Sequence, residues 1–338
     1  MKQLKSLLTV QWGIFLLLLF SSFACKAQPK LLALSKTDHT LAIVDASTLK
    51  ILGKVPVGSD PHEVIASSDG KTAYVSIYGG GRFHEIDVID IGQKKLVQKI
   101  DTRPFYGPHG LDFQNRKLWF TVEGTKTIAR YDPATNKIDW CMGSGQDRTH
   151  MIYVTDNGKN IFTTNVASGT VSIFTSKDAQ QGSSTFANWE QTVIPTFKGT
   201  EGFDVSPDGT EIWAASSDNG KIYVIDPVQK KIITTIDAKV LGANRLKFTP
   251  DGSKVFISSL RSGSIAIYDA KTRNEIKQLE VGHGAAGILM DPTGSRAFVA
   301  CTPDNYVVIV DLKTLQLTGH LKVGGGPDGL AWAKEATK

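Results

Sequence analysis

Three of the seven histidines in this chain share a sequence context, because each stands at the start of an apolar segment. His62 lies in DPHEVIA, His109 in GPHGLDF and His150 in RTHMIYV, and Glu201 occurs at a similar interval in GTEGFDV. Imidazole nitrogens combined with a carboxylate are ligands that Zn, Cu and Ni accept readily in proteins. The pattern therefore raises the hypothesis of a divalent metal site, for Zn, Cu, Ni or Mg, made by His62, His109, His150 and Glu201.

Residues so far apart can meet only if a repeated unit brings them together, and the sequence contains such a repeat. Segments such as KIYVIDPVQKK and SIAIYDAKTRN alternate between apolar and polar residues, end on an aspartate and enter a polar turn. The repeated aspartates are Asp45, Asp90, Asp132, Asp226, Asp269 and Asp311, and Thr175 occupies the one missing position. A period in the low forties with several short strands in each unit is typical of the blades of a β-propeller.

The number of units predicts how the ring closes. Each unit can be divided into four strands by alternation and turn chemistry, but the N-terminal unit has no first strand. The chain ends with PDGLAWAK, residues 327 to 334, which is a first strand without a blade. We therefore expect an all-β protein: a seven-bladed β-propeller over residues 28 to 338, closed by the C-terminal strand completing the N-terminal blade.

Aligning the units places one residue of each blade at the entrance of its innermost strand. These positions are Asp328, His62, His109, His150, Glu201, Asn244 and Ala286. Two interpretations stay open: the side chains converge on a ligand in a central funnel, or they cap backbone groups of neighbouring blades.

Further candidate ligand-binding residues accompany this ring. Asp328 and Asn244 belong to it, whereas Arg82 and His84 lie in a loop beyond the glycine run at residues 79 to 81, which could form a flap over the funnel. The other polar loop tips, Glu123 among them, are ordinary for a propeller and carry no hypothesis of their own.

The motifs that recur over residues 30 to 334 are PHG, an apolar strand, PDGK, YV, VIDxxTxK and VG. This repeated form resembles the YVTN family of seven-bladed β-propellers. This resemblance implies an exported binding or scaffold protein. GPHGLDF followed by LWFTVEG is also similar to the repeat of streptogramin B lyases, which would imply histidines, a glutamate and Mg²⁺ at the channel mouth, although a His-x-Glu pair is missing there. The alternative function is thus a metal-dependent lyase or lactonase that acts on a small cyclic ester at the same funnel.

The first 27 residues have the pattern of a secretory signal, with basic residues before an apolar run at positions 13 to 20 and small residues near the end. Cleavage after Ala27 would free a soluble protein, whereas cleavage before Cys25 would leave a cysteine for lipidation. We expect an exported protein located in the periplasm, on the outer membrane as a lipoprotein, or on the cell surface.

The low net charge of the chain without its leader argues against a nucleic acid partner. Loss of Lys2, Lys5 and Lys26 with the leader lowers the formal net charge from +5 to +2, so we expect no nucleic acid partner and no membrane contact beyond a lipid anchor on Cys25. We expect a monomer that takes a small-molecule or protein ligand at its funnel.

Cys141 and Cys301 lie in apolar segments and are predicted to be buried free thiols.

Overall fold

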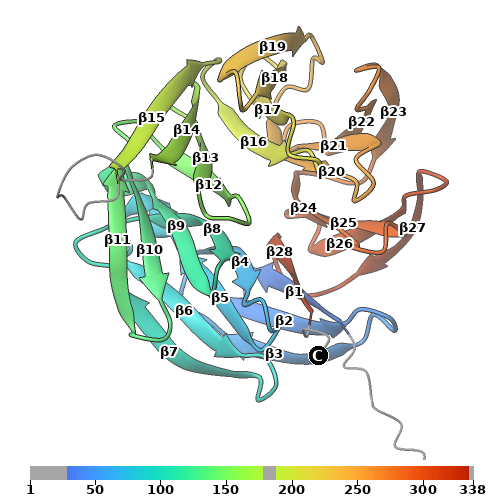
Figure 1. The fold of residues 1–338 in the computed structure, drawn as a ribbon. Coiled ribbons are helices and arrows are strands. Elements are labelled where there is room, and N and C mark those ends of the chain that lie inside the picture. The colour runs from blue at the N-terminus through green and yellow to red at the C-terminus, as the bar shows by residue number, and fades with distance from the viewer. Residues whose placement is uncertain (1–28, 178–187, 335–338) are drawn as a thin grey trace, which may run out of the picture.

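The computed structural model describes residues 29 to 177 and 188 to 334, which form seven four-stranded antiparallel sheets arranged in a ring (Figure 1). The prediction of an all-β, seven-bladed β-propeller is confirmed. We number the blades in chain order: blade 1 contains β1 to β3, and blades 2 to 7 begin at β4, β8, β12, β16, β20 and β24. The helices of the described chain are two single 3₁₀ turns, η1 (Gly79–Gly81) and η2 (Glu123–Thr125).

The innermost strand of each blade lies nearest the axis and contacts the innermost strands of its neighbours. Each one begins with proline, threonine or alanine and contains apolar residues further along the strand. These strands are β4 (Pro61–Ala66), β8 (Pro108–Gln114), β12 (Thr149–Val154), β16 (Thr200–Val205), β20 (Ala243–Phe248), β24 (Ala285–Met290) and β28 (Pro327–Ala333).

The two middle strands of each blade are buried along nearly their whole length, because adjacent blades cover both of their faces. Their aliphatic and aromatic side chains form the core between blades. The second strands are β1 (Lys30–Ser35), β5 (Thr72–Ile77), β9 (Lys117–Val122), β13 (Asn160–Asn165), β17 (Ile212–Ser216), β21 (Lys254–Ser259) and β25 (Arg296–Cys301). The third strands are β2 (Thr40–Asp45), β6 (Glu85–Asp90), β10 (Thr127–Asp132), β14 (Thr170–Lys177), β18 (Ile222–Asp226), β22 (Ser264–Asp269) and β26 (Tyr306–Asp311).

The outermost strands alternate between exposed and partly buried residues, as expected for the solvent edge of a blade. Cys141 lies in one of them and is exposed, so the prediction that it is buried is wrong, whereas Cys301 is a buried free thiol. The outermost strands are β3 (Ile51–Pro56), β7 (Lys95–Asp101), β11 (Lys137–Gly143), β15 (Asn188–Pro195), β19 (Lys231–Ile236), β23 (Glu275–Glu280) and β27 (Gln316–Leu321).

The repeated aspartates end the third strands and start the turns that follow. The carboxylates of Asp45, Asp90 and Asp311 each accept a hydrogen bond of 2.7 Å from a backbone N–H three residues later. This side-chain bond stabilises the turn directly after the strand. In blade 4, Thr175 stands at this position, its hydroxyl has no hydrogen-bond partner in the described chain, and β14 continues to Lys177.

The ring closes at blade 1, where the C-terminal strand β28 pairs with the N-terminal strand β1. Lys30 aligns with Ala333 and Ala33 with Leu330, so the two ends of the described chain share one sheet. This confirms the predicted closure. The leader with its cleavage sites and Cys25 lies outside the described residues, as do residues 178 to 187 between the third and fourth strands of blade 4. Within the described residues, no helix has the length and apolar character needed to cross a bilayer.

Candidate functional site

The aligned residues at the strand entrances form a ring around the axis, because each is the second residue of its innermost strand. In every blade the pairing of this strand with the second strand shifts register between its first and fourth residues, as it does between Pro108 and Leu111. A bulge of this kind releases a residue from the regular pleat and re-aims its side chain. The bulge therefore turns the second residue of each strand toward the funnel.

The residue after His109 explains why two of the histidines lie so close together. A Cβ atom on Gly110 would stand 2.4 Å from the carbonyl oxygen of His150, so only glycine allows the strands β8 and β12 to approach this closely. Thr121 holds the same contact, since its hydroxyl accepts a 2.9 Å bond from the Gly110 N–H and donates a 2.5 Å bond to the His150 carbonyl. Gly110 thus allows the two strands to pack closely enough for the imidazoles of His109 and His150 to come together.

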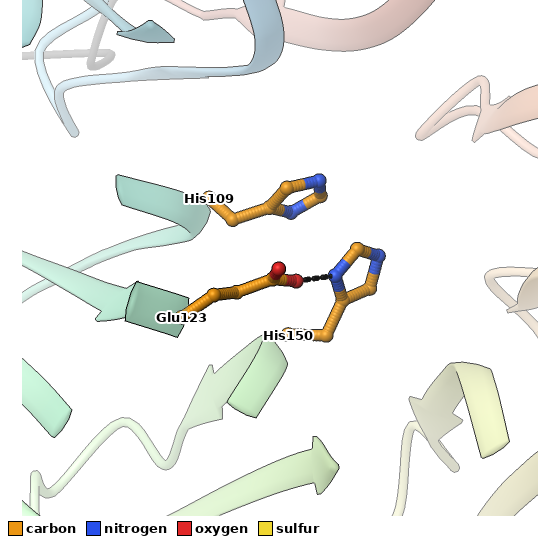
Figure 2. Close-up of side chains that lie close together, drawn as sticks. All are labelled: His109, Glu123 and His150. Carbon is orange, nitrogen blue, oxygen red and sulfur yellow. Dashed lines mark hydrogen bonds and ion pairs between the residues drawn. The ribbon is translucent and has the colours of Figure 1, made fainter. Parts of the chain in front are cut away.

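A buried cluster of His109, Glu123 and His150 lies at this point, with one ligand atom of each residue within 4.8 Å of the others. Figure 2 shows the three side chains projecting in the same direction from blades 3 and 4. Glu123 follows the last residue of β9 and begins η2, which places its carboxylate beside the two histidines. All three residues are more than nine-tenths buried.

Two carboxylates bind the two nitrogens of His150. Nδ1 hydrogen-bonds to Oε1 of Glu123, and Nε2 lies 3.2 Å from Oε1 of Glu201. Burial by itself would lower the pKa of His150, but the negative charges of Glu201 and Glu123 outweigh it and raise the pKa to about 9. In this state His150 is an imidazolium at neutral pH.

Glu201 is anchored from blade 6 as well as by His150. Its Oε1 accepts a 2.6 Å bond from Nδ2 of Asn244 and lies 3.3 Å from Nη1 of Arg245. Burial alone would raise the pKa of Glu201, but His150 and Arg245 lower it to about 2. Oδ1 of Asn244, by contrast, is buried without a hydrogen-bond partner in the described part of the chain.

His109 is neutral and incompletely bonded. Its ring packs against His150 with centroids 3.8 Å apart, and against His62 and Tyr78 at 5.0 Å. Burial first, and then the nearby positive charges, lower its pKa well below the usual range. Among the described residues, Nδ1 of His109 has no hydrogen-bond partner although it is buried.

Glu123 is held by residues of blades 2 and 4. The hydroxyl of Tyr78 donates to Oε2 of Glu123, and Nε of Arg148 lies 3.5 Å from the same oxygen. Burial would raise the pKa of Glu123, but His150 and Tyr78 outweigh this effect and lower it. The carboxylate is therefore ionised beside the unpartnered nitrogen of His109.

His62 belongs to a separate group on the other side of His109. Its Nε2 accepts a 2.7 Å bond from Nζ of Lys36, which also lies 3.3 Å from Asp328. Burial and the charge of Lys36 lower the pKa of His62, so this imidazole is neutral. Its nitrogens bond to Lys36 and to the backbone carbonyl of Asp60, and it packs against the cluster only through its ring.

A cavity of about 450 Å³ at one end of the axis is lined by the three histidines of the ring together with Glu201 and Asn244. Beneath it, Nη2 of Arg245 in β20 binds Oε1 of Glu63 in β4. The pair joins blades 6 and 2, which are not neighbours, so it crosses the channel. The floor of this funnel is therefore charged.

The structure thus divides the predicted site residues. His109 and His150 meet, whereas Glu201 binds the far nitrogen of His150 and His62 bonds to Lys36. Asp328 and Asn244 line the cavity, and their role as ligand-binding residues stays a prediction.

Arg82 and His84 do not line this cavity. His84 is paired with Asp101 at 3.1 Å, and Nε of Arg82 bonds weakly to its own loop. The glycine run expected to form a flap is a 3₁₀ turn, and Asp60 accepts a bond from the Gly80 N–H.

Sequence reasoning missed Glu123, because its position after a second strand makes it look like any polar loop tip. The available signal was its spacing: Glu123 directly follows the strand that pairs with the GPHG segment, so it lies beside the start of that segment. Pro108 aligns with Val122 in the sheet, so antiparallel pairing places Glu123 opposite Gly107, two residues before His109.

Fold and site define a seven-bladed β-propeller with a buried His-Glu-His cluster beside its axial cavity. The chain belongs to the cytochrome D1 heme domain family, whose model matches residues 100 to 299. The YVTN assignment stays a resemblance. No protein of curated function matches the chain in sequence.

Several solved structures share the fold. A functionally unknown protein from Desulfotomaculum acetoxidans DSM 771 has 14% identity and a TM-score of 0.71, covering 89% of this chain and 98% of its own. A candidate 6-phosphogluconolactonase from Bacteroides fragilis NCTC 9343 has 15% identity and a TM-score of 0.71, covering 90% and 98%. Dihydro-heme d1 dehydrogenase NirN in complex with DHE has 13% identity and a TM-score of 0.61, covering 89% and 74%. At these identities the likeness shows the fold alone.

Proposed function

We propose that this protein is an exported β-propeller that binds a divalent transition metal ion through His109, Glu123 and His150. The observation that carries the proposal is the buried, unpartnered Nδ1 of His109 beside an ionised carboxylate. A buried polar atom without a partner is costly, and a ligand can satisfy it. Two imidazoles and one carboxylate form a ligand set suited to Zn²⁺, Ni²⁺ or Cu²⁺.

The contact between Glu201 and His150 supports this assignment. A histidine that binds a metal usually donates its other N–H to a carboxylate, which fixes the tautomer and the ring orientation. With Nε2 facing Glu201, Nδ1 of His150 is the nitrogen that faces Glu123 and the cluster. We therefore assign Glu201 the role of orienting His150, in place of the direct ligation suggested by the sequence.

The proton on His150 stands where the metal would bind. Because metal ligation requires neutral imidazole, binding must displace a proton from a group whose pKa is about 9. The two carboxylates around the imidazolium are then free to compensate the charge of the ion. Metal uptake is thus a proton-for-metal exchange within a preformed set of ligands.

The haem named in the family description does not fit the funnel in this arrangement. Haem iron is held by an axial ligand such as histidine, cysteine, methionine or tyrosine, and a histidine can serve only if its ring nitrogen faces space for the macrocycle. The imidazole of His109 is instead packed between His150 and His62, at 3.8 and 5.0 Å between centroids. The basic side chains that could bind the carboxylates of the macrocycle also have acidic partners within 3.5 Å: Lys36 with Asp328, Arg148 with Glu123, and Arg245 with Glu201.

Metal content decides the proposal directly. The purified untagged protein, reconstituted with Zn²⁺, Cu²⁺, Ni²⁺ or Mg²⁺ and desalted, should retain about one ion per chain by mass spectrometry, with Mg²⁺ weakest because two ligands are imidazoles. His109→Ala and Glu123→Gln should lose it, whereas the control His320→Ala, at an exposed position of β27, should not. A wild-type chain that retains no ion would refute the proposal, and a haem absorption spectrum lost in His109→Ala would replace it.

A second candidate function is metal-dependent opening of a small cyclic ester. It is favoured by the number of ligands, since catalytic metal sites use three protein ligands and keep one position open, and His109 and His150 line the cavity of about 450 Å³. A metal-bound water there would be activated for attack on a carbonyl. Hydrolysis of a lactone panel by the loaded protein, absent in Glu123→Gln, is the expected result, and metal binding without turnover would leave the binding function alone.

Export is the remaining part of the proposal, and the leader of residues 1 to 27 supports it. Expression of the full chain in a bacterial host, followed by fractionation, should place the protein outside the cytoplasm. Membrane association that is lost in Cys25→Ser would assign the lipoprotein form. A chain that stays cytoplasmic with its leader intact would contradict export.

A further inference from the structure

Seven equivalent backbone positions, each two residues before a ring residue, have left-handed conformations. Five of the seven are glycine, the residue that adopts positive φ without steric cost. The positions and their φ angles are Asp60 (57°), Gly107 (72°), Arg148 (52°), Gly199 (78°), Gly242 (75°), Gly284 (53°) and Gly326 (60°).

Of the two exceptions, Asp60 has local contacts that explain it. Aspartate tolerates the left-handed region better than most residues, and its side chain accepts a bond from the Gly80 N–H and lies 3.4 Å from Nδ1 of His62. Arg148 has no such explanation within the backbone, because a long side chain gains nothing from positive φ. Arg116, Lys126 and Arg273 have positive φ as well, so the backbone conformation assigns no role by itself and the surroundings of the Arg148 side chain decide.

The side chain of Arg148 lines the cavity beside the cluster. Its Nε lies 3.5 Å from Oε2 of Glu123, and about half of the side chain is exposed. Across the cavity, blades 6 and 7 contribute the apolar side chains of Leu260, Ala286 and Pro303, beside the polar Asn244, Arg245 and Thr302. The cavity therefore has a guanidinium and the candidate metal site on one side and a mixed wall with an apolar patch on the other.

We propose that Arg148 binds the carboxylate of a small organic acid whose apolar body lies against Leu260, Ala286 and Pro303. A guanidinium matches a carboxylate with two parallel N–H donors. The inference rests on the proposed metal site, because an ion that draws Glu123 to itself releases Arg148 from its acidic partner and places positive charge next to it. The cavity of about 450 Å³ lies in the range that holds small ligands.

The test uses butyrate as the probe and Co²⁺ as a coloured metal. The full chain and its variants are first loaded with Co²⁺, and bound cobalt is measured by mass spectrometry. Butyrate is then titrated while the visible spectrum of the ion is followed, with n-butanol as the uncharged control. We expect saturable changes with butyrate and none with butanol.

Arg148→Gly is the informative variant, because it restores the residue that five other blades carry. It should melt at the same temperature as the wild type or higher, while its butyrate dissociation constant should rise about tenfold or more through loss of a charge-assisted bond. Lys126→Met removes an exposed charge whose side chain pairs with Asp147, and should bind butyrate as the wild type does.

The outcomes separate the two proposals. Failure to bind Co²⁺ overturns the metal site and this inference with it. Cobalt binding with a spectrum that butyrate does not change overturns the carboxylate site alone. Equal butyrate affinity in Arg148→Gly and wild type also overturns it, as does an Arg148→Gly protein that melts well below the wild type, because the residue would then be structural.

Discussion

His150 carries the electrostatic balance of the funnel. Its two ring nitrogens face Glu123 and Glu201, Arg148 lies near the same carboxylates, and the neutral ring of His109 stacks on it. Removing any one of these charges would leave another buried without compensation, which is expensive in a low dielectric. The pair of carboxylates is thus stable only when a cation stands between them, either the imidazolium or a metal ion.

This balance predicts a pH dependence of stability for the metal-free protein. The pKa of His150 is raised from 6.5 to about 9 on folding, so its contribution is fully present below pH 6.5 and is lost as the pH rises through 9. We expect the free energy of unfolding to fall by on the order of 3 kcal/mol between pH 7 and pH 10. Chemical denaturation at a series of pH values measures it.

The matched variant for this prediction is His150→Gln, which keeps a hydrogen-bonding side chain but does not titrate. Its free energy of unfolding should be lower than that of the wild type at pH 6.5 and should not decrease further as the pH rises through 9. An identical fall in wild type and variant would assign the pH dependence to another group.

At the scale of elements, glycine at the third position of an innermost strand sets the distance between blades. Gly110, Gly202, Gly287 and Gly329 each face the backbone of the next innermost strand, where a Cβ would stand 2.2 to 2.8 Å from a carbonyl oxygen. Near the axis the blades converge, and a methyl group is enough to separate them. The glycines therefore determine whether ring residues of neighbouring blades can touch.

Gly110→Ala should destabilise the protein by about 2–3 kcal/mol through overpacking, and should weaken metal binding because His109 and His150 move apart. The control is Gly143→Ala at the end of β11, where a methyl group would have no atom of the described chain within 4 Å. That substitution should change the unfolding free energy by less than about 0.5 kcal/mol. Equal effects of the two substitutions would contradict the role of close approach.

The closing strand β28 gives a second prediction at this scale. Deleting residues 327 to 338 removes the partner of β1 and leaves the blade with an unpaired inner edge, so we expect aggregation and loss of the cooperative melting transition. Deleting only residues 335 to 338 leaves the paired strand in place and should have little effect. A longer deletion that melts like the wild type would exclude this closure.

At the scale of the whole molecule, the ion pair of Arg245 and Glu63 ties opposite sides of the ring. It joins blades that are separated by two or three others along the circumference, and the Arg245 side chain also contacts Glu201, which orients His150. The floor of the funnel and the candidate metal site are therefore parts of one buried network. Its integrity depends on the ring as a whole.

Breaking this pair should be costly, because the remaining partner is a buried charge. Arg245→Met and Glu63→Gln should each lower the unfolding free energy by about 3 kcal/mol or more, and the double variant should cost less than their sum. Urea denaturation of the four proteins completes the cycle. The exposed pair of Lys177 and Glu190 should show coupling below about 1 kcal/mol in the same measurement, and a similar coupling for both pairs would mean that the channel pair is not special.

The sequence by itself determined the fold, because local signals agree with one another along the whole chain. The repeated aspartates set the strand ends, alternation set the strands, and the orphan strand at residues 327 to 334 set the blade count. It also placed His109 and His150 at equivalent positions of neighbouring blades, since a position in a repeat becomes a position in the ring. Each of these signals depends on a few neighbouring residues and can be recognised without knowing how the side chains pack.

Only the tertiary structure decided which residues complete the site. Glu123 reaches His109 from the turn that follows the paired strand, and Glu201 reaches the far nitrogen of His150 from the neighbouring blade. His62 is drawn to Lys36 by a contact between blades 1 and 2 that no spacing indicates. The physical reason is that a repeat fixes where the backbone lies, whereas the direction of a side chain depends on hydrogen bonds and charges from blades distant in sequence.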